Sequence, residues 1–245
     1  MRVVITLSTQ QRLLAAIASA RRIDAAVYLP AGGFARALAG AARRGAAVTL
    51  HVAGTMPPGS SRERALDAML PALRAAGVHI VLERDAIEHL KAVVIDGREG
   101  YLADRNFARD ETLLRTDEAD AVGAAIDHRP ARSRDILLGT KGEVQDAEAA
   151  LVRAAPAGTE VLAVSEFAND SAVVRAMLAR AGQLRETLIV GATGAGLPAE
   201  ARALAALAAK GVRVEVAQIA EKGLCIGAET IVTSANDSVG QPSMR

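Results

Sequence analysis

Short runs of β-branched residues alternate along this chain with longer stretches, rich in Ala, Leu and Arg, that have helical periodicity. This alternation is typical of βαβ units, in which helices cover a largely parallel sheet. We therefore expect an α/β fold. In the first half the pattern predicts helices at residues 10–20, 34–44 and 63–76 and strands at residues 25–29, 47–52, 78–82 and 90–95.

The second half repeats this order of elements. Residues 73–78 and 207–212 correspond closely, since each combines a helix end, a Gly and the start of a strand. We expect two duplicated lobes, 1–128 and 129–245, packed about a pseudo-twofold axis and joined by the polar segment 127–134. The predicted helices of the second half are 144–154, 171–181 and 199–210, and its strands are 161–164, 188–190, 212–216 and two short ones around Leu224 and Ile231.

Composition limits the ligands that the chain can hold without a dedicated site. With 51% hydrophobic residues in 245, the chain can bury a substantial core. Aromatic residues make up only 2%, so stacking platforms for single-stranded nucleic acid are scarce. The formal net charge of +1 gives no strong field for attracting polyanions. An anionic ligand must therefore be bound by local contacts.

The compartment is inferred from cysteine usage and hydropathy. Cys225 is the one cysteine in the sequence, which excludes an intrachain disulfide and a Cys-based metal cluster. No apolar stretch approaches the roughly 20 residues that span a bilayer, and the apolar run before Ser8 is too short for a secretory signal. We expect a cytoplasmic protein with no metal, no cofactor and no stable membrane insertion.

The segment from His89 to Gly97 places ionisable groups around an apolar run. On a strand, His89 and Lys91 point to the same face because they are two residues apart. A phosphate bound there would meet an ammonium, which donates a charge-assisted hydrogen bond, and a neutral imidazole, which can attack phosphorus. Asn106 follows Lys91 by fifteen residues, and its amide can donate to a second phosphoryl oxygen.

The pattern His-x-Lys-x4-Asp, carried by His89, Lys91 and Asp96 and followed by Asn106, resembles the defining motif of the phospholipase D-like superfamily. The resemblance implies a phospholipase D-like fold whose two lobes bring their motifs together at the pseudo-twofold axis. It also implies metal-independent chemistry through a phosphohistidine on His89. In such proteins a second His protonates the leaving group and then activates water or an alcohol.

The resemblance also assigns roles to two acidic positions. The Asp of the motif more often anchors the strand and turn than touches substrate, so we expect a structural role for Asp96, although we count it with the catalytic set. A carboxylate shortly after the Asn commonly orients the nucleophilic His, and Asp110 or Glu111 occupies that place. We take Glu111 as the candidate; the alternative is that this acidic pair is simply solvated.

The motif of the second half is degenerate. Aligning Lys222 with Lys91 puts Ala220 at the His position and Gly227 at the Asp position. The second imidazole is therefore missing, and with it a general acid that typically contributes roughly 10²–10⁴-fold to the rate. Three substitutes remain open: Glu221 or a nearby acid, a homodimer that pairs two copies of His89, or a substrate with a good leaving group.

The phosphate donors of the second half are retained. Ser234 and Asn236 resemble the Gly-Ser-x-Asn element of the superfamily with Thr233 in place of Gly, and Asn236 is one residue closer to its Lys than Asn106 is to Lys91. The predicted phosphate-binding residues are Lys91, Asn106, Lys222, Ser234 and Asn236.

Two functions are consistent with these residues. The first is a phosphodiester hydrolase or a phosphatidyl or phosphoryl transferase, acting on a phospholipid or a nucleic acid, between which the sequence does not decide. The alternative is a catalytically weak or inactive phospholipase D-like pseudoenzyme that binds an anionic phosphate ligand or a protein partner.

Other polar positions have simpler interpretations. His51 and His79 lie at or near strands and are expected to be packing or surface residues. The Gly-rich run 191–196 lacks the Gly-x-Gly-x-x-Gly order of a dinucleotide loop and is expected to be a βα turn. Ser165 and Glu166 follow a predicted strand and can line a cleft at the carboxyl ends of the sheet or cap a helix.

Overall fold

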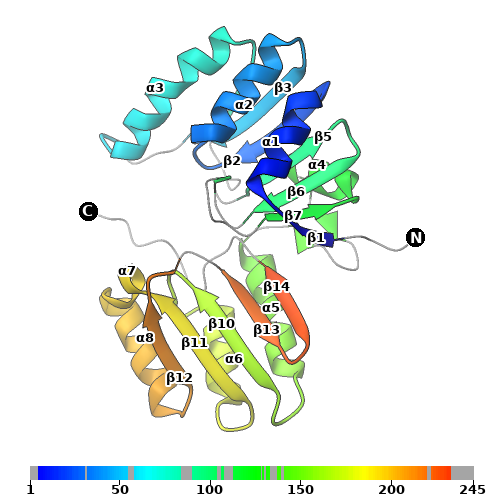
Figure 1. The fold of residues 1–245 in the computed structure, drawn as a ribbon. Helices are drawn as coiled ribbons and strands as arrows, with labels where there is room; N and C mark the ends of the chain where they lie inside the picture. The colour runs from blue at the N-terminus through cyan, green and yellow to red at the C-terminus, as the bar shows by residue number, and fades with distance from the viewer. Residues whose placement is uncertain are drawn as a thin grey trace. The chain divides into compact units, whose positions relative to one another are not determined.

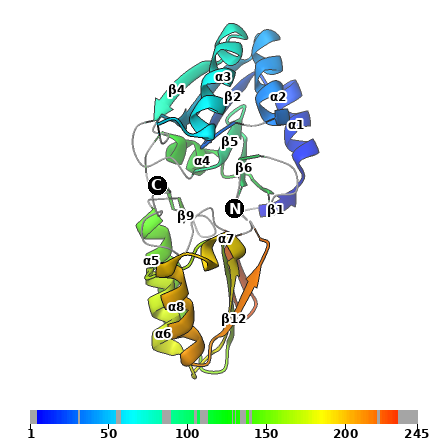
Figure 2. The same ribbon diagram turned by 90° about the vertical axis from the view of Figure 1, so that its left-hand side faces the viewer.

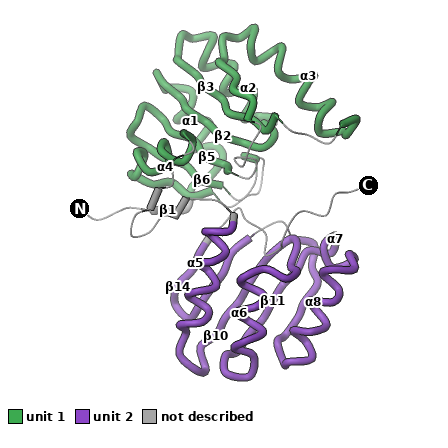
Figure 3. Tube along the Cα trace, turned by 180° about the vertical axis from the view of Figure 1, so that it is seen from behind, with its two compact units in different colours: residues 1–139 green, residues 140–245 purple. Residues whose placement is uncertain are grey.

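The structure, a computed structural model, divides into two compact units, residues 1–139 and 140–245 (Figure 3). Each unit has its own hydrophobic core. The α/β fold expected from the sequence is confirmed. The residues that the structure describes are 5–30, 32–54, 58–83, 90–103, 106–107, 113–127, 129, 131–132, 137–138, 141–219 and 222–232.

In its described part, the first unit is built on a seven-stranded sheet of order β1-β7-β6-β5-β2-β3-β4 (Figure 1). β2, β3 and β4 are parallel, and β5 runs antiparallel to β2. The carboxyl ends of these three strands therefore share one edge of the sheet with the start of β5. The strands are β1 (Ile5–Ser8), β2 (Arg22–Val27), β3 (Ala47–Ala53), β4 (His79–Glu83), β5 (Ala92–Ile95), β6 (Glu99–Ala103) and β7 (Leu113–Thr116).

Helices cover both faces of this sheet. The apolar residues of α1, α2 and α3 pack with one face, which includes Val93 and Ile95 of β5. The alternate residues Ala92 and Val94 pack with α4, as expected from side chains that point to opposite faces of a strand. The helices in the described residues of this unit are α1 (Gln10–Ser19), α2 (Gly32–Arg43), α3 (Ser61–Ala75) and α4 (Ala119–Ile126). A short ribbon pairs β8 (Ala131–Arg132) with β9 (Leu137–Leu138).

The second unit has a five-stranded sheet of order β12-β11-β10-β13-β14 in the described residues. Figure 2 shows α5, α6 and α8 along one face of this sheet, where their apolar residues form the core of the unit. The strands are β10 (Glu160–Ser165), β11 (Arg185–Gly191), β12 (Arg213–Ala217), β13 (Gly223–Ile226) and β14 (Glu229–Val232), and the helices are α5 (Lys141–Ala154), α6 (Ala172–Arg180), α7 (Ala192–Ala195) and α8 (Pro198–Ala209).

The two units share one strand order and one pairing register. The order β4-β3-β2-β5-β6 of the first unit recurs as β12-β11-β10-β13-β14 in the second. Ile23 pairs with Val48 and Ile95, and Val161 pairs in the same way with Glu186 and Ile226. The repeat agrees with duplicated lobes, but the duplication itself and the lobes 1–128 and 129–245 stay predictions.

The correspondence between residues 73–78 and 207–212 is confirmed in detail. Gly77 has a φ of +94° and Gly211 a φ of +89°, the left-handed conformation that favours Gly after a helix. The N–H of the Val that follows each Gly donates to the carbonyl of Leu73 or Leu207, at 3.1 Å in both cases. Both helices therefore end with the same reversal into the next strand.

Several elements differ from their predictions. The strand expected from residue 90 begins at Ala92, and β2 begins at Arg22, three residues before its predicted start. The run 191–196, expected to be only a turn, contains the short helix α7. The sequence pattern did not predict β1, β6, β7 or α4. Among the helices in the described ranges, none is both long and apolar enough to cross a membrane.

Candidate functional site

Lys91 lies at the edge of the first sheet where β2, β3 and β4 end. It immediately precedes β5, and its carbonyl accepts the N–H of Ala103 at 3.0 Å, so its backbone is held against the end of β6. The residue is only 7% exposed. A largely buried ammonium at a strand end is well placed to bind a phosphoryl oxygen. The predicted strand face shared with His89 is not tested, because His89 lies outside the described residues.

Asn106 is fixed at the same edge. Its Oδ1 accepts the N–H of Leu29, two residues beyond β2, at 3.3 Å. The next residue, Phe107, has a φ of +58°, stacks on Phe34 with ring centroids 4.6 Å apart, and accepts a hydrogen bond from Gln10 Nε2 at 2.7 Å. Because Oδ1 is bound to the backbone, Nδ2 is the end of the amide that can donate to a ligand.

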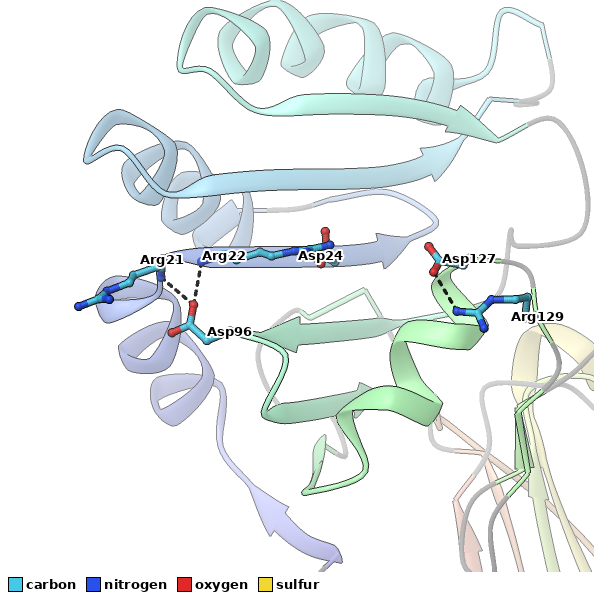
Figure 4. A network of polar contacts seen from close by, with 6 residues as sticks. All are labelled: Arg21, Arg22, Asp24, Asp96, Asp127 and Arg129. Carbon is cyan, nitrogen blue, oxygen red and sulfur yellow. Dashed lines mark hydrogen bonds and ion pairs between the residues drawn. The ribbon is translucent and has the colours of Figure 1, made fainter.

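Asp96 lies at the opposite end of β5. Its Oδ1 accepts the backbone N–H groups of Arg21 at 2.8 Å and Arg22 at 2.7 Å, so it ties the β5–β6 turn to the start of β2 (Figure 4). It is five residues from Lys91, roughly 17 Å along a strand. These contacts agree with the structural role expected for Asp96, and its inclusion in the catalytic set stays a prediction.

Lys222 occupies the position of Lys91 in the second unit. It immediately precedes β13, and its side chain is 9% exposed. Its Nζ lies 4.0 Å from Oε2 of Glu166, which directly follows β10. Ser165 is fully buried and donates to the carbonyl of Phe167 at 2.8 Å, so its hydroxyl stabilises the turn. Of the two residues expected near the carboxyl ends, Glu166 has the exposed side chain.

Two glycines of the run 191–196 pack closely against the backbone of this turn. A Cβ at Gly194 would lie 2.2 Å from the carbonyl oxygen of Glu166, and one at Gly191 would lie 2.9 Å from the same atom. Such distances leave no space for a side chain. The two glycines therefore allow the backbone of Glu166 to pack closely against the end of β11 and the helix α7.

The difference in Lys-to-Asn spacing is explained by the hairpin turns. Ile95 pairs with Glu99 across the residues 96–98, whereas Ile226 pairs with Glu229 across Gly227 and Ala228 alone. Beyond the turn the registers agree again, since Ala92 pairs with Leu102 and Gly223 with Val232. Asn106 and Asn236 each follow that last paired residue by four positions.

The remaining predicted site residues lie outside the described residues. They are His89, Glu111 with its neighbour Asp110, Ala220, Glu221, Ser234 and Asn236. Within the ranges that the structure describes, no three His, Cys, Asp or Glu side chains gather as metal ligands do.

Sequence reasoning missed two side-chain pairings, one in each unit. Nδ1 of His51 lies 2.6 Å from Oε1 of Glu83, and both side chains are largely buried. The pairing of Lys222 with Glu166 was also missed. Each joins residues of neighbouring strands that are far apart in sequence, and only the strand order brings them together.

Shifted carboxyl pKa values lie elsewhere in the described part. A hydrogen bond from Arg115 lowers the pKa of Glu99 in β6. Burial raises the pKa of Glu186, at the start of β11, to about 7, and the charge of Arg180 offsets this in part. Glu186 is at the end of β11 opposite to the glycines that pack on Glu166.

Comparison with known proteins supports the fold. No protein-family model matches the sequence, and a search of curated proteins found no match. Polyphosphate kinase from Porphyromonas gingivalis aligns with 96% of this chain, at 17% identity and a TM-score of 0.61. The chain spans 45% of the length of that kinase.

Two further solved structures are similar. Phosphatidylserine synthase from Haemophilus influenzae aligns over 91% of this chain and 75% of its own, at 10% identity and a TM-score of 0.52. Nuc, a phospholipase D family member from Salmonella typhimurium, aligns over 52% of this chain and 94% of its own, at 18% identity and a TM-score of 0.45. The kinase and the synthase are members of the phospholipase D superfamily. The chain thus has the phospholipase D fold that its motif implies.

Proposed function

We propose that this protein is a metal-independent phosphodiester hydrolase or phosphatidyl or phosphoryl transferase that works through a phosphohistidine on His89. The observation that carries the proposal is the placement of Lys91 and Asn106 at one edge of the first sheet. In the sequence, Lys91 follows His89 by two residues. An ammonium and an amide N–H are complementary to two phosphoryl oxygens. Glu111 is proposed to orient the imidazole.

The proposed reaction has two steps. A nitrogen of His89 attacks phosphorus, the ester P–O bond breaks, and the phosphoryl group is carried on the imidazole. The oxygen of water or of an acceptor alcohol then attacks phosphorus, the P–N bond breaks, and the imidazole is restored. Lys91 and Asn106 stabilise the charge that develops on the phosphoryl oxygens, and Lys222, Ser234 and Asn236 are proposed as further donors.

The substrate class follows from the missing imidazole. Without a second His to protonate the departing oxygen, the first step favours leaving groups that are stable as anions. The names of the similar enzymes, a polyphosphate kinase and a phosphatidylserine synthase, agree with transfer of a phosphoryl or phosphatidyl group. Phospholipid and nucleic-acid diesters are both substrates to be tested.

A chromogenic phosphodiester in the presence of EDTA tests the proposal. We expect His89→Ala to lower the rate at least roughly 10³-fold, because the nucleophile is lost. His79→Ala is the matched control, since His79 is exposed at the start of β4. Labelled substrate should leave an acid-labile phosphohistidine on the wild type and not on the His89 variant. Equal rates for wild type and His89→Ala would remove the assignment.

A pseudoenzyme is the second candidate. Its supporting observation is the second unit, where Lys222 already has a carboxylate partner and the motif positions are Ala220 and Gly227. This candidate predicts saturable binding of inorganic phosphate, weakened by Lys91→Met, with no turnover of any diester. A homodimer would instead supply a second copy of His89, which is tested by measuring oligomeric state and activity at the same protein concentrations.

A further inference from the structure

Tyr28 lies at the edge of the first sheet that holds Lys91 and Asn106. It immediately follows β2, whose last residue lies opposite Lys91 in the antiparallel pairing with β5. The next residue, Leu29, donates its N–H to Oδ1 of Asn106 at 3.3 Å. The backbone of Tyr28 therefore lies beside both candidate phosphate donors of the first unit.

The second unit shows how far a side chain at this position can reach. The strands β2 and β10 share one pairing register, in which Tyr28 corresponds to Glu166. In the second unit, Oε2 of Glu166 lies 4.0 Å from Nζ of Lys222. The shared register therefore indicates that the side chain of Tyr28 is within reach of Lys91, in a site made from the first unit alone.

Arg62 brings a further cation to Tyr28. The central carbon of its guanidinium lies 5.7 Å from the centroid of the Tyr28 ring, within the range of a cation–π contact. Tyr28 is half-buried, whereas Arg62 is exposed. Among the residues that the structure describes, no carboxylate forms an ion pair with Arg62. Its N–H groups, which lie in the plane of the guanidinium, can therefore bind a phosphate in a bidentate manner.

Helix stability does not account for Arg62. The residue lies in the first turn of α3, where the helix dipole favours carboxylates over cations. The start of this helix is already capped, because Ser60 accepts the N–H of Glu63 at 3.1 Å and Oε2 of Glu63 accepts the N–H of Gly59 at 2.5 Å. The first turn of α8 in the second unit, residues 198–201, has no arginine. Residues that oppose a local preference are expected at functional sites.

We propose that Arg62, supported by the ring of Tyr28, binds a second phosphate group of the substrate while Lys91 and Asn106 bind the phosphoryl group that reacts. This role rests on the proposed function. It makes Arg62 and Tyr28 specificity-determining residues, which select diesters whose organic arm carries a further phosphate. Because the formal net charge is only +1, the protein has no strong general field for polyanions, and such a substrate is recognised by these local cations.

Two substrates that differ in one group test the site in the full chain. They are p-nitrophenyl phosphodiesters of propanediol, whose free end carries either a second phosphate or a hydroxyl. We expect the wild type to have a roughly 10-fold higher kcat/KM for the phosphate-ended substrate, the lower end of what a charge-assisted hydrogen bond contributes. Arg62→Gln should bring the ratio of the two values to about one, through a higher KM for the phosphate-ended substrate. Its kinetics with the hydroxyl-ended substrate should match those of the wild type.

The ring of Tyr28 is tested with the same pair of substrates. Tyr28→Phe retains a ring beneath the guanidinium and should keep most of the preference, whereas Tyr28→Leu should lose most of it. Adding Arg62→Gln to Tyr28→Leu should have little further effect, because both changes act on one binding group. Arg74→Gln is the matched control, since Arg74 is an exposed arginine in the last turn of the same helix. This control should keep the wild-type ratio.

The outcomes separate this role from the proposed function. If the wild type cleaves both substrates equally well, or if Arg62→Gln keeps the preference, Arg62 does not have this role and the proposed function stands. If the wild type cleaves neither substrate, the proposed function is lost and this role with it. If Arg62→Gln does not fold, Arg62→Lys is measured instead, and it should keep only part of the preference because an ammonium lacks the bidentate geometry.

Two kinds of natural molecule carry such a pair of phosphates. A dinucleotide with a terminal phosphate and a lysolipid with a phosphorylated headgroup are therefore tested as inhibitors of cleavage of the phosphate-ended substrate. A compound that inhibits the wild type, and inhibits Arg62→Gln roughly 10-fold less strongly, supports the role and identifies the source. Inhibition by neither compound, or equal inhibition of the wild type and the variant, would contradict it.

Discussion

Lys91 and Lys222 occupy the same position in two sheets of the same order, but their neighbours differ. Lys91 lies at the same edge of its sheet as Asn106 and is two residues from His89 in sequence. Lys222 is two residues from Ala220 and lies beside Glu166. The common frame thus keeps a largely buried lysine at the strand start in both units, while the residues near that lysine differ between the units.

Removing each cation in turn is the strongest test of this comparison. A charge-assisted hydrogen bond contributes roughly 1.5–3 kcal/mol, so each lysine supports up to roughly 10²-fold in kcat/KM. We expect Lys91→Met to lower kcat/KM by about 10²-fold and Lys222→Met by somewhat less. The rates are measured with an aryl phosphodiester. Lys210→Met, at the exposed end of α8, is the control.

The double variant shows whether the two cations act on one phosphate. If they do, the combined loss should differ from the product of the single losses, because residues that serve one ligand are coupled. If Lys222→Met leaves kcat/KM unchanged, the cation of the second unit has no part in the reaction. The comparison would then be between a catalytic unit and a purely structural one.

The two units also differ in a way that affects stability, because Glu186 of the second unit stands where the first unit has a valine. It occupies the register position of Val48 in the first unit, and the two residues are 5% and 4% exposed. Neither carboxylate oxygen of Glu186 has a hydrogen-bond partner among the described residues. Burial raises its pKa from 4.5 to about 7. The charged form is therefore disfavoured in the folded protein.

This shift makes stability depend on pH. The unfolded chain loses the proton near pH 4.5 and the folded chain near pH 7, so stability falls as the pH rises between these values and stays low above them. At 1.36 kcal/mol per pKa unit, the loss reaches about 3 kcal/mol. Glu186→Val should raise the free energy of unfolding at pH 8 by about 2–3 kcal/mol and flatten its pH dependence.

Urea unfolding of the full chain between pH 5 and pH 8 checks this expectation. Arg180 retains two other partners in the variant, the carbonyls of Arg153 and Ala155, each at 2.7 Å. Val48→Glu is the converse change and should introduce a similar pH dependence into the first unit. A wild-type protein with constant stability across this range would contradict the raised pKa.

The smallest expected effect concerns the turns at the far ends of β5 and β13. The N–H of Asp96 donates to the carbonyl of Arg22, and the N–H of Gly227 donates to the carbonyl of Glu160, at 2.9 Å in both cases. Only Asp96 also has a carboxylate, which accepts the backbone N–H groups at the start of β2. Asp96→Gly should destabilise the protein by about 1–2 kcal/mol, comparable with loss of a helix cap. Its activity should remain near that of the wild type, measured beside thermal unfolding. A large loss of activity without a loss of stability would support the place of Asp96 in the catalytic set.

Many of the helices and strands could be predicted from local sequence patterns. The reversal at Gly77 and Gly211 was predictable because a helix end, a Gly and a β-branched run each have local causes. The strand β1 and the hairpin of β6 and β7 were not predicted. The pairing of β1 with β7, such as Ile5 with Thr116, joins residues far apart in the sequence, and no local signal encodes such partners.

The part of the candidate site that belongs to the sequence motif could be predicted from residue spacing. Lys91, Lys222 and Asp96 were identified from spacing, and the structure places both lysines at equivalent strand starts. The partner of Lys222 was not identifiable, because Glu166 lies 56 residues earlier and reaches it only through the antiparallel pairing of β10 and β13. The partners of Asp96 are similarly distant.

The three-residue loop of the first hairpin, against two residues in the second, has a consequence for how related sequences are compared. A single insertion inside a strand would exchange its inward and outward side chains, whereas an insertion at the hairpin tip leaves both strands in phase. The chain can therefore change length at this tip without changing the register of the two paired strands. A search pattern for such motifs should let the interval from Lys to Asn vary by one.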